Sequence, residues 1–207
     1  MAEREAQVEL PSLGLPDDAF EQRRPLRGQI TKREVRAVSL YLLGLRGDSV
    51  VWDIGAGTGS VAIEAGRIAR RGSVYAVERD PDSTGLLCRN VERLAGCNVK
   101  VVPGEAPQAL ESLPDPDSIF VGGSGGQLAG ILDAATARLK HDGRLVVNLA
   151  ALERTSEVYH WLKDKGMVVE LSNINASRGK EMPDGTVRLE ALNPVFIVAA
   201  QWKEQAP

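Results

Sequence analysis

Several residue types on which catalytic and binding sites often depend are scarce in this chain of 207 residues. It contains two His, two Cys and three each of Trp, Tyr and Phe. His141, His160, Cys88 and Cys97 are too few for a zinc cluster built from the protein alone, or for a His-centred catalytic triad. So few aromatic rings also argue against a stacked platform for single-stranded nucleic acid. We therefore expect no metal site, and a structural or neutral role for these four residues.

The chain also lacks a strong excess of either charge and a long apolar run. Lys and Arg total 25 against 28 Asp and Glu, a net charge of −3, whereas proteins that coat nucleic acid are usually basic. The longest uncharged stretch, residues 118–132, is interrupted by glycines and falls short of the ~20 residues of a membrane-spanning helix. The N-terminus has no apolar core of the signal-peptide kind. These features predict a cytoplasmic protein that binds neither nucleic acid nor membrane.

From residue 49 onward, buried-strand patterns alternate with helical ones. Strands are predicted at 50–54, 73–77, 98–102, 118–121 and 144–149, and helices at 60–70, 80–94, 107–112, 127–139 and 152–165. Such alternation favours parallel strands joined by right-handed crossovers. Two further strands, 167–175 and 195–202, have no helix between them, although 186–190 also alternates and Pro183-Asp184-Gly185 indicates a turn. We therefore predict a Rossmann-like α/β fold: a seven-stranded, mostly parallel, doubly wound sheet with an antiparallel C-terminal hairpin at its edge.

The residues before the first strand divide into an arm and a helix. Residues 1–30 carry several prolines and runs of charge, which predicts an extended arm with at most one helical turn near 17–23. Thr31-Lys32-Arg33-Glu34 has the sequence of a capping box, which predicts a helix start at this point. We therefore expect an N-terminal arm at 1–30 and a single domain at 31–207.

A glycine-rich loop joins the first predicted strand to the helix that follows it. The sequence DIGAGTGS at 53–60 places glycines where the chain must turn tightly and let a ligand approach the backbone. Glu78 ends the second strand, close to the ~20 residues beyond Gly55 at which an acid binds ribose hydroxyls. The glycines follow G-x-G-x-G rather than the dinucleotide pattern G-x-G-x-x-G, and Asp53 would repel a phosphate. This segment resembles motif I of the class I S-adenosylmethionine-dependent methyltransferases.

Two other strand ends carry small residues. Gly104, Glu105 and Ala106 follow the third strand, where the resemblance implies a border for the adenine ring. Gly122, Gly123, Ser124 and Gly125 follow the fourth strand and offer a flat floor without a general base, which suits a bulky substrate. The resemblance to class I methyltransferases implies S-adenosylmethionine as cofactor and the following binding residues: Thr31, Asp53, Gly55, Ala56, Gly57, Thr58, Gly59, Glu78, Gly104, Glu105 and Ala106.

Five segments together resemble one family, the decarboxylating precorrin methyltransferases of cobalamin biosynthesis. They are GLPDDAF at 14–20, ITKREVR at 30–36, 53–60, 119–126 and EALNPV at 190–195. The resemblance implies methylation of carbon 15 of a corrinoid tetrapyrrole with decarboxylation of the carbon-12 acetate, and a homotetramer. It also implies a partner carbon-5 methyltransferase, as a separate subunit or a fused domain. The pattern fits a cobalt-containing or a metal-free substrate equally.

Such a substrate supplies its own carbon nucleophile and electron sink, so the protein mainly holds two reactants in line and excludes water. No catalytic side chain is predicted. The substrate carries many carboxylates, so cationic side chains should surround it, and Lys180 is one candidate. The candidate substrate-binding residues are Lys32, Arg36, Gly122, Gly123, Ser124, Gly125, Asn148, Arg178 and Arg188.

Three other functions stay open from the residues alone. One is a tRNA or protein methyltransferase on the same scaffold, although the fourth strand lacks the acid expected for nucleobase work. Another is a non-catalytic subunit that binds S-adenosylmethionine and assists a partner. The third is a nicotinamide dehydrogenase, which the alternating glycines disfavour.

Overall fold

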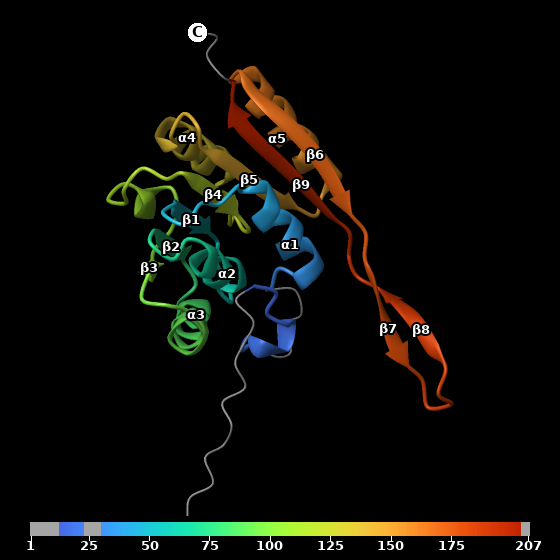
Figure 1. Ribbon diagram of the computed structural model, residues 1–207. Helices are drawn as coiled ribbons and strands as arrows, with labels where there is room; N and C mark the ends of the chain where they lie inside the picture. The colour runs from blue at the N-terminus through green and yellow to red at the C-terminus, as the bar shows by residue number, and fades with distance from the viewer. Residues whose placement is uncertain (1–12, 23–29, 204–207) are drawn as a thin grey trace, which may run out of the picture.

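The computed structural model describes residues 13–22 and 30–203 (Figure 1). Seven strands form the main sheet: β1 (Val50–Ile54), β2 (Ser73–Glu78), β3 (Val99–Pro103), β4 (Ser118–Val121), β5 (Arg144–Leu149), β6 (Met167–Ile174) and β9 (Val195–Trp202). The helices are α1 (Arg33–Leu42), α2 (Ser60–Ile68), α3 (Pro81–Leu94), α4 (Leu128–Arg138) and α5 (Leu152–Asp164), with short 3₁₀ helices η1 (Asp17–Ala19) and η2 (Gln108–Leu110). The predicted helix at 107–112 is thus reduced to a single 3₁₀ turn.

The strand order β3-β2-β1-β4-β5-β9-β6 confirms the predicted sheet. The first five strands pair in parallel, whereas β9 runs antiparallel to both β5 and β6. The hairpin of β6 and β9 lies at the edge, as predicted, and β6 is its outer strand. Because the order of the strands along the sheet reverses between β1 and β4, the carboxyl ends of these two parallel strands border a crevice.

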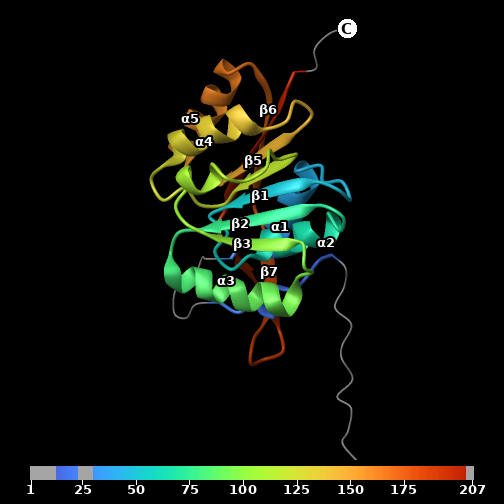
Figure 2. The same ribbon diagram turned by 90° about the vertical axis from the view of Figure 1, so that its left-hand side faces the viewer.

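Alternation along each strand divides the core into two layers. Trp52 and Ile54 of β1 pack in the layer that contains residues of α4 and α5, and Val51 packs in the layer of α1, α2 and α3. Figure 2 shows helices on both sides of the sheet. Buried strands covered on both faces explain the nearly continuous apolar runs in the sequence. None of the helices in the described ranges has the length and apolar character that a bilayer span requires.

The described part of the arm packs onto the domain. Leu15 and Phe20 are buried in a small cluster with Ile63 of α2 and Leu94 of α3. The predicted helical turn is the 3₁₀ helix η1, which covers only residues 17–19, and residues 23–29 lie outside the described ranges. Pro16 and Phe20 on either side of this turn are extended, as expected for the arm, and buried apolar side chains hold residues 13–22 against α2 and α3.

The predicted capping box, with Thr31 as the N-cap of the first helix, is not formed. Helix α1 begins at Arg33 and its N-cap residue is Lys32, whose side chain makes no capping hydrogen bond. The backbone N–H of Arg33 instead donates to Asp17 Oδ1 of the arm at 3.0 Å, while Glu34 binds Arg178. The helix end is thus satisfied by a residue that is distant in sequence.

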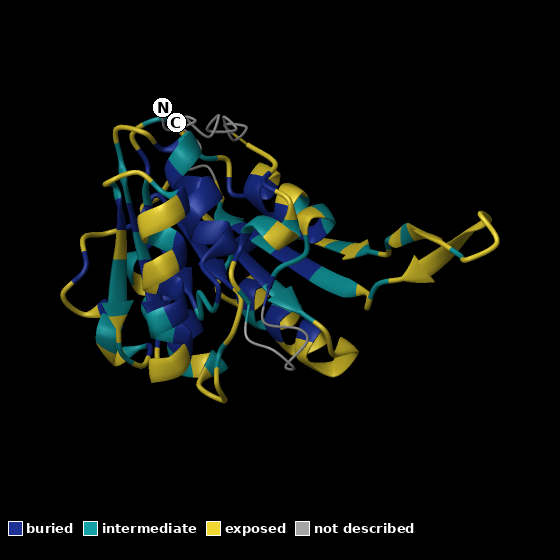
Figure 3. Cartoon of the chain, turned by 90° about the horizontal axis from the view of Figure 1, so that it is seen from below, coloured by how far each residue is buried: buried dark blue, intermediate teal, exposed yellow. Residues whose placement is uncertain are grey.

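A two-stranded ribbon projects from the body between β6 and β9 (Figures 1 and 3). It consists of β7 (Ser177–Glu181) and β8 (Val187–Ala191), and most of its residues are exposed. Strand β8 agrees with the predicted strand at 186–190 to within one residue, and the predicted turn lies at Gly185, where φ is +80°. Strand β7 is not predicted by the sequence pattern, because its residues, SRGKE, are polar and do not alternate.

Candidate functional site

A large cavity opens at the carboxyl ends of the strands. Its volume is about 2110 Å³ and its lining includes Asp53 of β1, Glu78 of β2, Phe120 of β4 and Asn148 of β5. A single drug-sized ligand usually occupies about 300–1,000 Å³. The cavity therefore has room for two reactants, one of them bulky.

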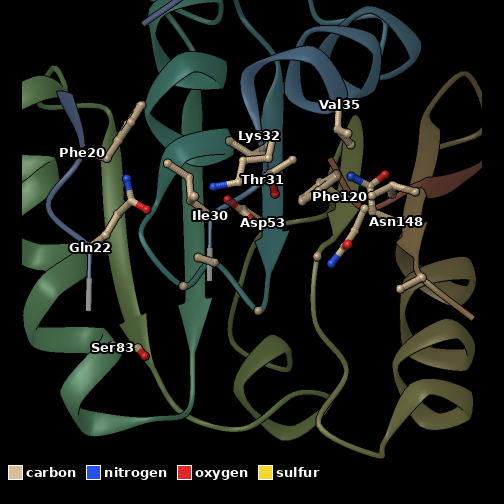
Figure 4. Close-up of a pocket in the computed structure, with 18 of the residues that line it drawn as sticks. Phe20, Gln22, Ile30, Thr31, Lys32, Val35, Asp53, Ser83, Phe120 and Asn148 are labelled. Atoms are coloured by element: carbon tan, nitrogen blue, oxygen red, sulfur yellow. The ribbon is translucent and has the colours of Figure 1, made fainter. Parts of the chain in front are cut away.

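The arm and the base of the ribbon form the walls of this cavity. Figure 4 shows Phe20 and Gln22 of the arm on one side, and Phe120 and Asn148 on the other, with Asp53 between them. Residues 190–195 at the foot of the ribbon complete the lining. Two segments that the sequence analysis matched to one family, 14–20 and 190–195, thus both contribute to one cavity.

The glycine-rich loop lies at the bottom of the cavity in a left-handed conformation. The φ angles of Gly55, Gly57 and Gly59 are +73°, +54° and +78°, values that residues other than glycine rarely adopt. The Gly55 N–H donates to the Val77 carbonyl at 2.9 Å, and the Gly57 N–H donates to Glu78 Oε2 at 2.8 Å. The loop is therefore fastened to the end of β2.

Only part of this loop lines the cavity. Residues 55–57 do, whereas Thr58 is buried below them. A Cβ at Gly59 would lie 2.3 Å from Leu87 Cδ1 of α3, so this glycine allows the helix to pack closely. The structure thus places Thr58 and Gly59 away from the cavity, because α3 covers them.

The glycines after β4 pack against the loop after β1. A Cβ at Gly55 would lie 2.4 Å from the Gly123 carbonyl oxygen, so the two backbones are in direct contact. Gly122 lines the large cavity, whereas Gly123, Ser124 and Gly125 line a smaller one of about 160 Å³ together with Gly104, Glu105 and Ala106. The predicted floor for a substrate is therefore in large part the wall of the smaller cavity.

Asp53 is an unusual carboxyl group for a position beside a cavity. It is 1% exposed; its Oδ2 accepts a hydrogen bond from the Ala62 N–H at 2.8 Å, and its Oδ1 has no partner among the described residues. Burial raises the pKa of Asp53 to about 7, opposed by the Ala62 hydrogen bond and aided by the Glu78 carboxylate. Its negative charge is therefore incomplete at neutral pH until a cation approaches.

Glu78 is held in one orientation by the backbone. Its Oε1 accepts from the Asp80 N–H at 2.9 Å and its Oε2 from the Gly57 N–H at 2.8 Å. Each carboxylate oxygen can accept a further hydrogen bond. Glu78 is thus positioned to receive two neighbouring hydroxyl groups on the cavity side.

Some substrate candidates line the large cavity. Lys32 and Gly122 do, and so does Asn148, whose side chain exchanges hydrogen bonds with Ser39 of α1. Thr31, a predicted cofactor-binding residue, also lines it. Among the described residues, the Lys32 ammonium makes no hydrogen bond or ion pair, and Figure 4 shows it near Thr31. Lys32 therefore retains a cation for a ligand.

The structure places three of the predicted substrate residues outside the lining of the large cavity. Arg36 is 1% exposed and its guanidinium pairs with Glu64 and Asp17, so it anchors the arm. Arg178 pairs with Asp17 and Glu34, and this pairing lowers the pKa of Glu34 to about 2. Arg188 is exposed on the ribbon and, like the other two, does not line the cavity.

Two lining cations were missed in the sequence analysis. Arg79 directly follows Glu78, and Arg93 lies on α3, where it donates to the Ala19 carbonyl of the arm. Because Arg79 directly follows Glu78, the acid that ends β2, its sequence position could have predicted that it lies beside the cavity. Among the described residues, no group of three or more His, Cys, Asp or Glu could hold a metal ion.

Comparisons with known proteins show the family to which this chain belongs. Residues 18–203 match the family model of the precorrin methyltransferase domain. The chain belongs to the precorrin methyltransferase family. A probable cobalt-precorrin-6B C(15)-methyltransferase (decarboxylating) from Pyrobaculum calidifontis is 40% identical over 189 residues, which cover 90% of this chain and 95% of the relative.

A solved structure and a longer relative extend the match. The crystal structure of a precorrin-6y C5,15-methyltransferase from Geobacter metallireducens has a TM-score of 0.88 and 40% identity, covering 95% of this chain and 100% of that chain. The precorrin-6Y C(5,15)-methyltransferase [decarboxylating] of a Sinorhizobium species is 45% identical over 121 residues, 58% of this chain but 29% of the relative. This member of the precorrin methyltransferase family is therefore an enzyme, and the Pyrobaculum and Geobacter relatives align with nearly its whole length.

Proposed function

We propose that this chain transfers a methyl group from S-adenosylmethionine to carbon 15 of cobalt-precorrin-6B and decarboxylates the carbon-12 acetate, in cobalamin biosynthesis. The main support is the cavity of about 2110 Å³, which joins a nucleoside-type site at the loop after β1 to a wide space between the arm and the ribbon. The names of the relatives that match over most of their length support the cobalt-containing substrate.

The residues at the bottom of the cavity fit the donor. We assign the donor's ribose hydroxyls to Glu78, its amino-acid ammonium to the unpartnered Oδ1 of Asp53, and its adenine to the wall formed by Gly104, Glu105 and Ala106. A cation beside Asp53 would favour the charged carboxylate. When bound, the donor supplies a sulfonium methyl group, and the chain's own residues orient it and exclude water.

The residues of the walls fit a substrate with many carboxylates. We assign one carboxylate to Lys32 and a polar substituent to Asn148, and we place the ring system between the arm and residues 190–195. We assign no general base, since the conjugated macrocycle provides both the carbon nucleophile and the electron sink. This division agrees with the scarcity of His and Cys in the chain.

The deciding experiment is a single-turnover reaction of the full chain with labelled S-adenosylmethionine and cobalt-precorrin-6B. We expect S-adenosylhomocysteine and CO₂ in equal amounts with a methylated product. Glu78→Gln should weaken S-adenosylhomocysteine binding by roughly tenfold or more, because hydrogen bonds to a charged group are lost. Glu157→Gln, on the exposed face of α5, serves as the control. Tight donor binding without any turnover would instead support a non-catalytic subunit.

We further propose that the chain acts as a homotetramer in the cytoplasm, beside a carbon-5 methyltransferase that is separate or fused. Val187 and Leu189 on the ribbon are 68% and 77% exposed, and apolar side chains so exposed favour a contact between subunits. The fused relative, of which the match covers 29%, supports the second partner. Sedimentation equilibrium of the full chain measures the number of subunits.

A further inference from the structure

Three loops at the carboxyl ends of β2, β3 and β4 meet at one side chain, Arg79. Its Nη1 donates to Glu105 Oε1 at 2.9 Å and to the Gly125 carbonyl oxygen at 3.2 Å. Arg79 itself follows β2, Glu105 follows β3 and Gly125 follows β4. The guanidinium therefore bridges the two segments on either side of the smaller cavity.

Gly125 is shaped to receive this guanidinium. Its φ is +54°, and a Cβ at this position would lie 2.4 Å from Arg79 Cζ. Any other residue would push the guanidinium off the loop. The absence of a side chain at Gly125, in the GGSGG segment, thus lets the Arg79 guanidinium pack against the backbone of this loop.

The smaller cavity has an apolar bottom and a charged rim. Ile54, Val77, Ala106 and Ile131 line it and are at most 7% exposed, whereas the side chains of Arg79 and Glu105 are 52% and 48% exposed. Its volume of about 160 Å³ suits a single planar ring system. A planar cation at the rim of an apolar slot can lie against the face of an aromatic ring.

We propose that Arg79 binds the nucleobase of the donor: the base enters the smaller cavity and the Arg79 guanidinium packs against its face. Glu105 and the Gly125 carbonyl act as positioning groups, since they hold the guanidinium at the rim. This inference rests on the proposed function, because it takes the donor to be a nucleoside. It adds a residue that selects the base end of the ligand.

The test compares two ligands that differ only in the base. S-adenosylhomocysteine carries adenine, whereas S-ribosylhomocysteine has the same ribose and amino acid without it. Arg79→Met keeps an unbranched apolar side chain but removes the planar cation. We expect it to weaken S-adenosylhomocysteine binding by roughly five- to thirtyfold, and to leave S-ribosylhomocysteine binding unchanged, in isothermal titration calorimetry of the full chain.

Further variants separate stacking from charge. Arg79→Lys keeps the charge without the planar face, so it should resemble Arg79→Met. Glu105→Gln should show a smaller loss, because the Gly125 carbonyl still holds the guanidinium. The control is Arg154→Met, which breaks a similar exposed pair with Glu157 at 2.8 Å on α5 and should bind both ligands like the wild type.

Each outcome bears on one of the two proposals. If Arg79→Met loses affinity for both ligands equally, or if Arg79→Lys binds like the wild type, Arg79 does not contact the base. An unchanged preference for S-adenosylhomocysteine in Arg79→Met would sink the inference and leave the methyltransferase proposal standing. Failure of the wild-type chain to bind S-adenosylhomocysteine would overturn both.

Discussion

The bottom and the walls of the large cavity are built in different ways. The bottom is a run of neighbouring residues, 53–57, whose backbone is fixed by Val77 and Glu78 at the end of the adjacent strand. The walls come from segments at opposite ends of the chain, and Arg178 of the ribbon reaches Asp17 of the arm across 161 residues. Backbone geometry thus forms the proposed donor end, whereas long-range charge pairs hold together the walls of the proposed substrate end.

The largest expected effect is on the walls. Glu64 accepts hydrogen bonds from the Gly14 and Leu15 N–H groups and from Arg36, whose side chain is 1% exposed. Glu64→Leu should lower the free energy of unfolding by roughly 3–5 kcal/mol, because it leaves a buried cation without its main partner. Urea denaturation measures this change. Glu157→Leu, which breaks an exposed pair, should change stability by less than about 1 kcal/mol.

A substitution at the bottom should have a somewhat smaller effect on stability. Gly55→Ala combines a positive φ with a Cβ 2.4 Å from the Gly123 carbonyl oxygen. We expect a loss of roughly 2–4 kcal/mol, together with loss of donor binding. Gly185→Ala is the matched control, since φ is +80° there but no atom lies within 4 Å of the added Cβ. Equal losses in the two variants would show that the contact between the loops contributes nothing.

The smallest effect concerns protonation at the bottom of the cavity. Because the pKa of Asp53 is raised to about 7, the neutral acid predominates below that pH. A cationic ammonium binds the charged form better, so S-adenosylhomocysteine binding should tighten as pH rises through 7. We expect binding at pH 8 to be roughly tenfold tighter than at pH 6. Asp53→Asn should give a flat profile; a profile with the wild-type slope would assign the titration to another group.

The same contrast explains what the sequence could predict. The sheet, the glycine loop and Glu78 follow from local periodicity and from spacing within one strand-helix-strand unit, and the strand order confirms the predicted fold. The N-cap at Asp80 is equally local, since its side chain accepts from Ser83 at 3.1 Å. Such features depend on residues close in sequence.

The errors concern pairs of residues far apart in the chain. Arg36 and Arg178 were expected to face a polyanionic substrate, but Glu64, Asp17 and Glu34 neutralise them. Charge alone does not reveal which carboxylate folds back onto a given arginine. The predicted capping box did not form for the same reason: Asp17, distant in sequence, accepts the hydrogen bond from the Arg33 N–H, and Arg178 binds Glu34.

Asp17 has a consequence for the shape of the cavity's mouth. Its Oδ1 accepts from the Arg33 N–H and from Arg36 Nη1, and its Oδ2 accepts from Arg178 Nη2. One carboxylate therefore joins the arm, the start of α1 and the foot of the ribbon. These three elements cannot shift independently, so the mouth behaves as one continuous rim rather than as two separate flaps. A force applied to the ribbon, such as contact with a neighbouring subunit, would reach the arm directly through the Arg178–Asp17 pair and indirectly through Glu34 and helix α1.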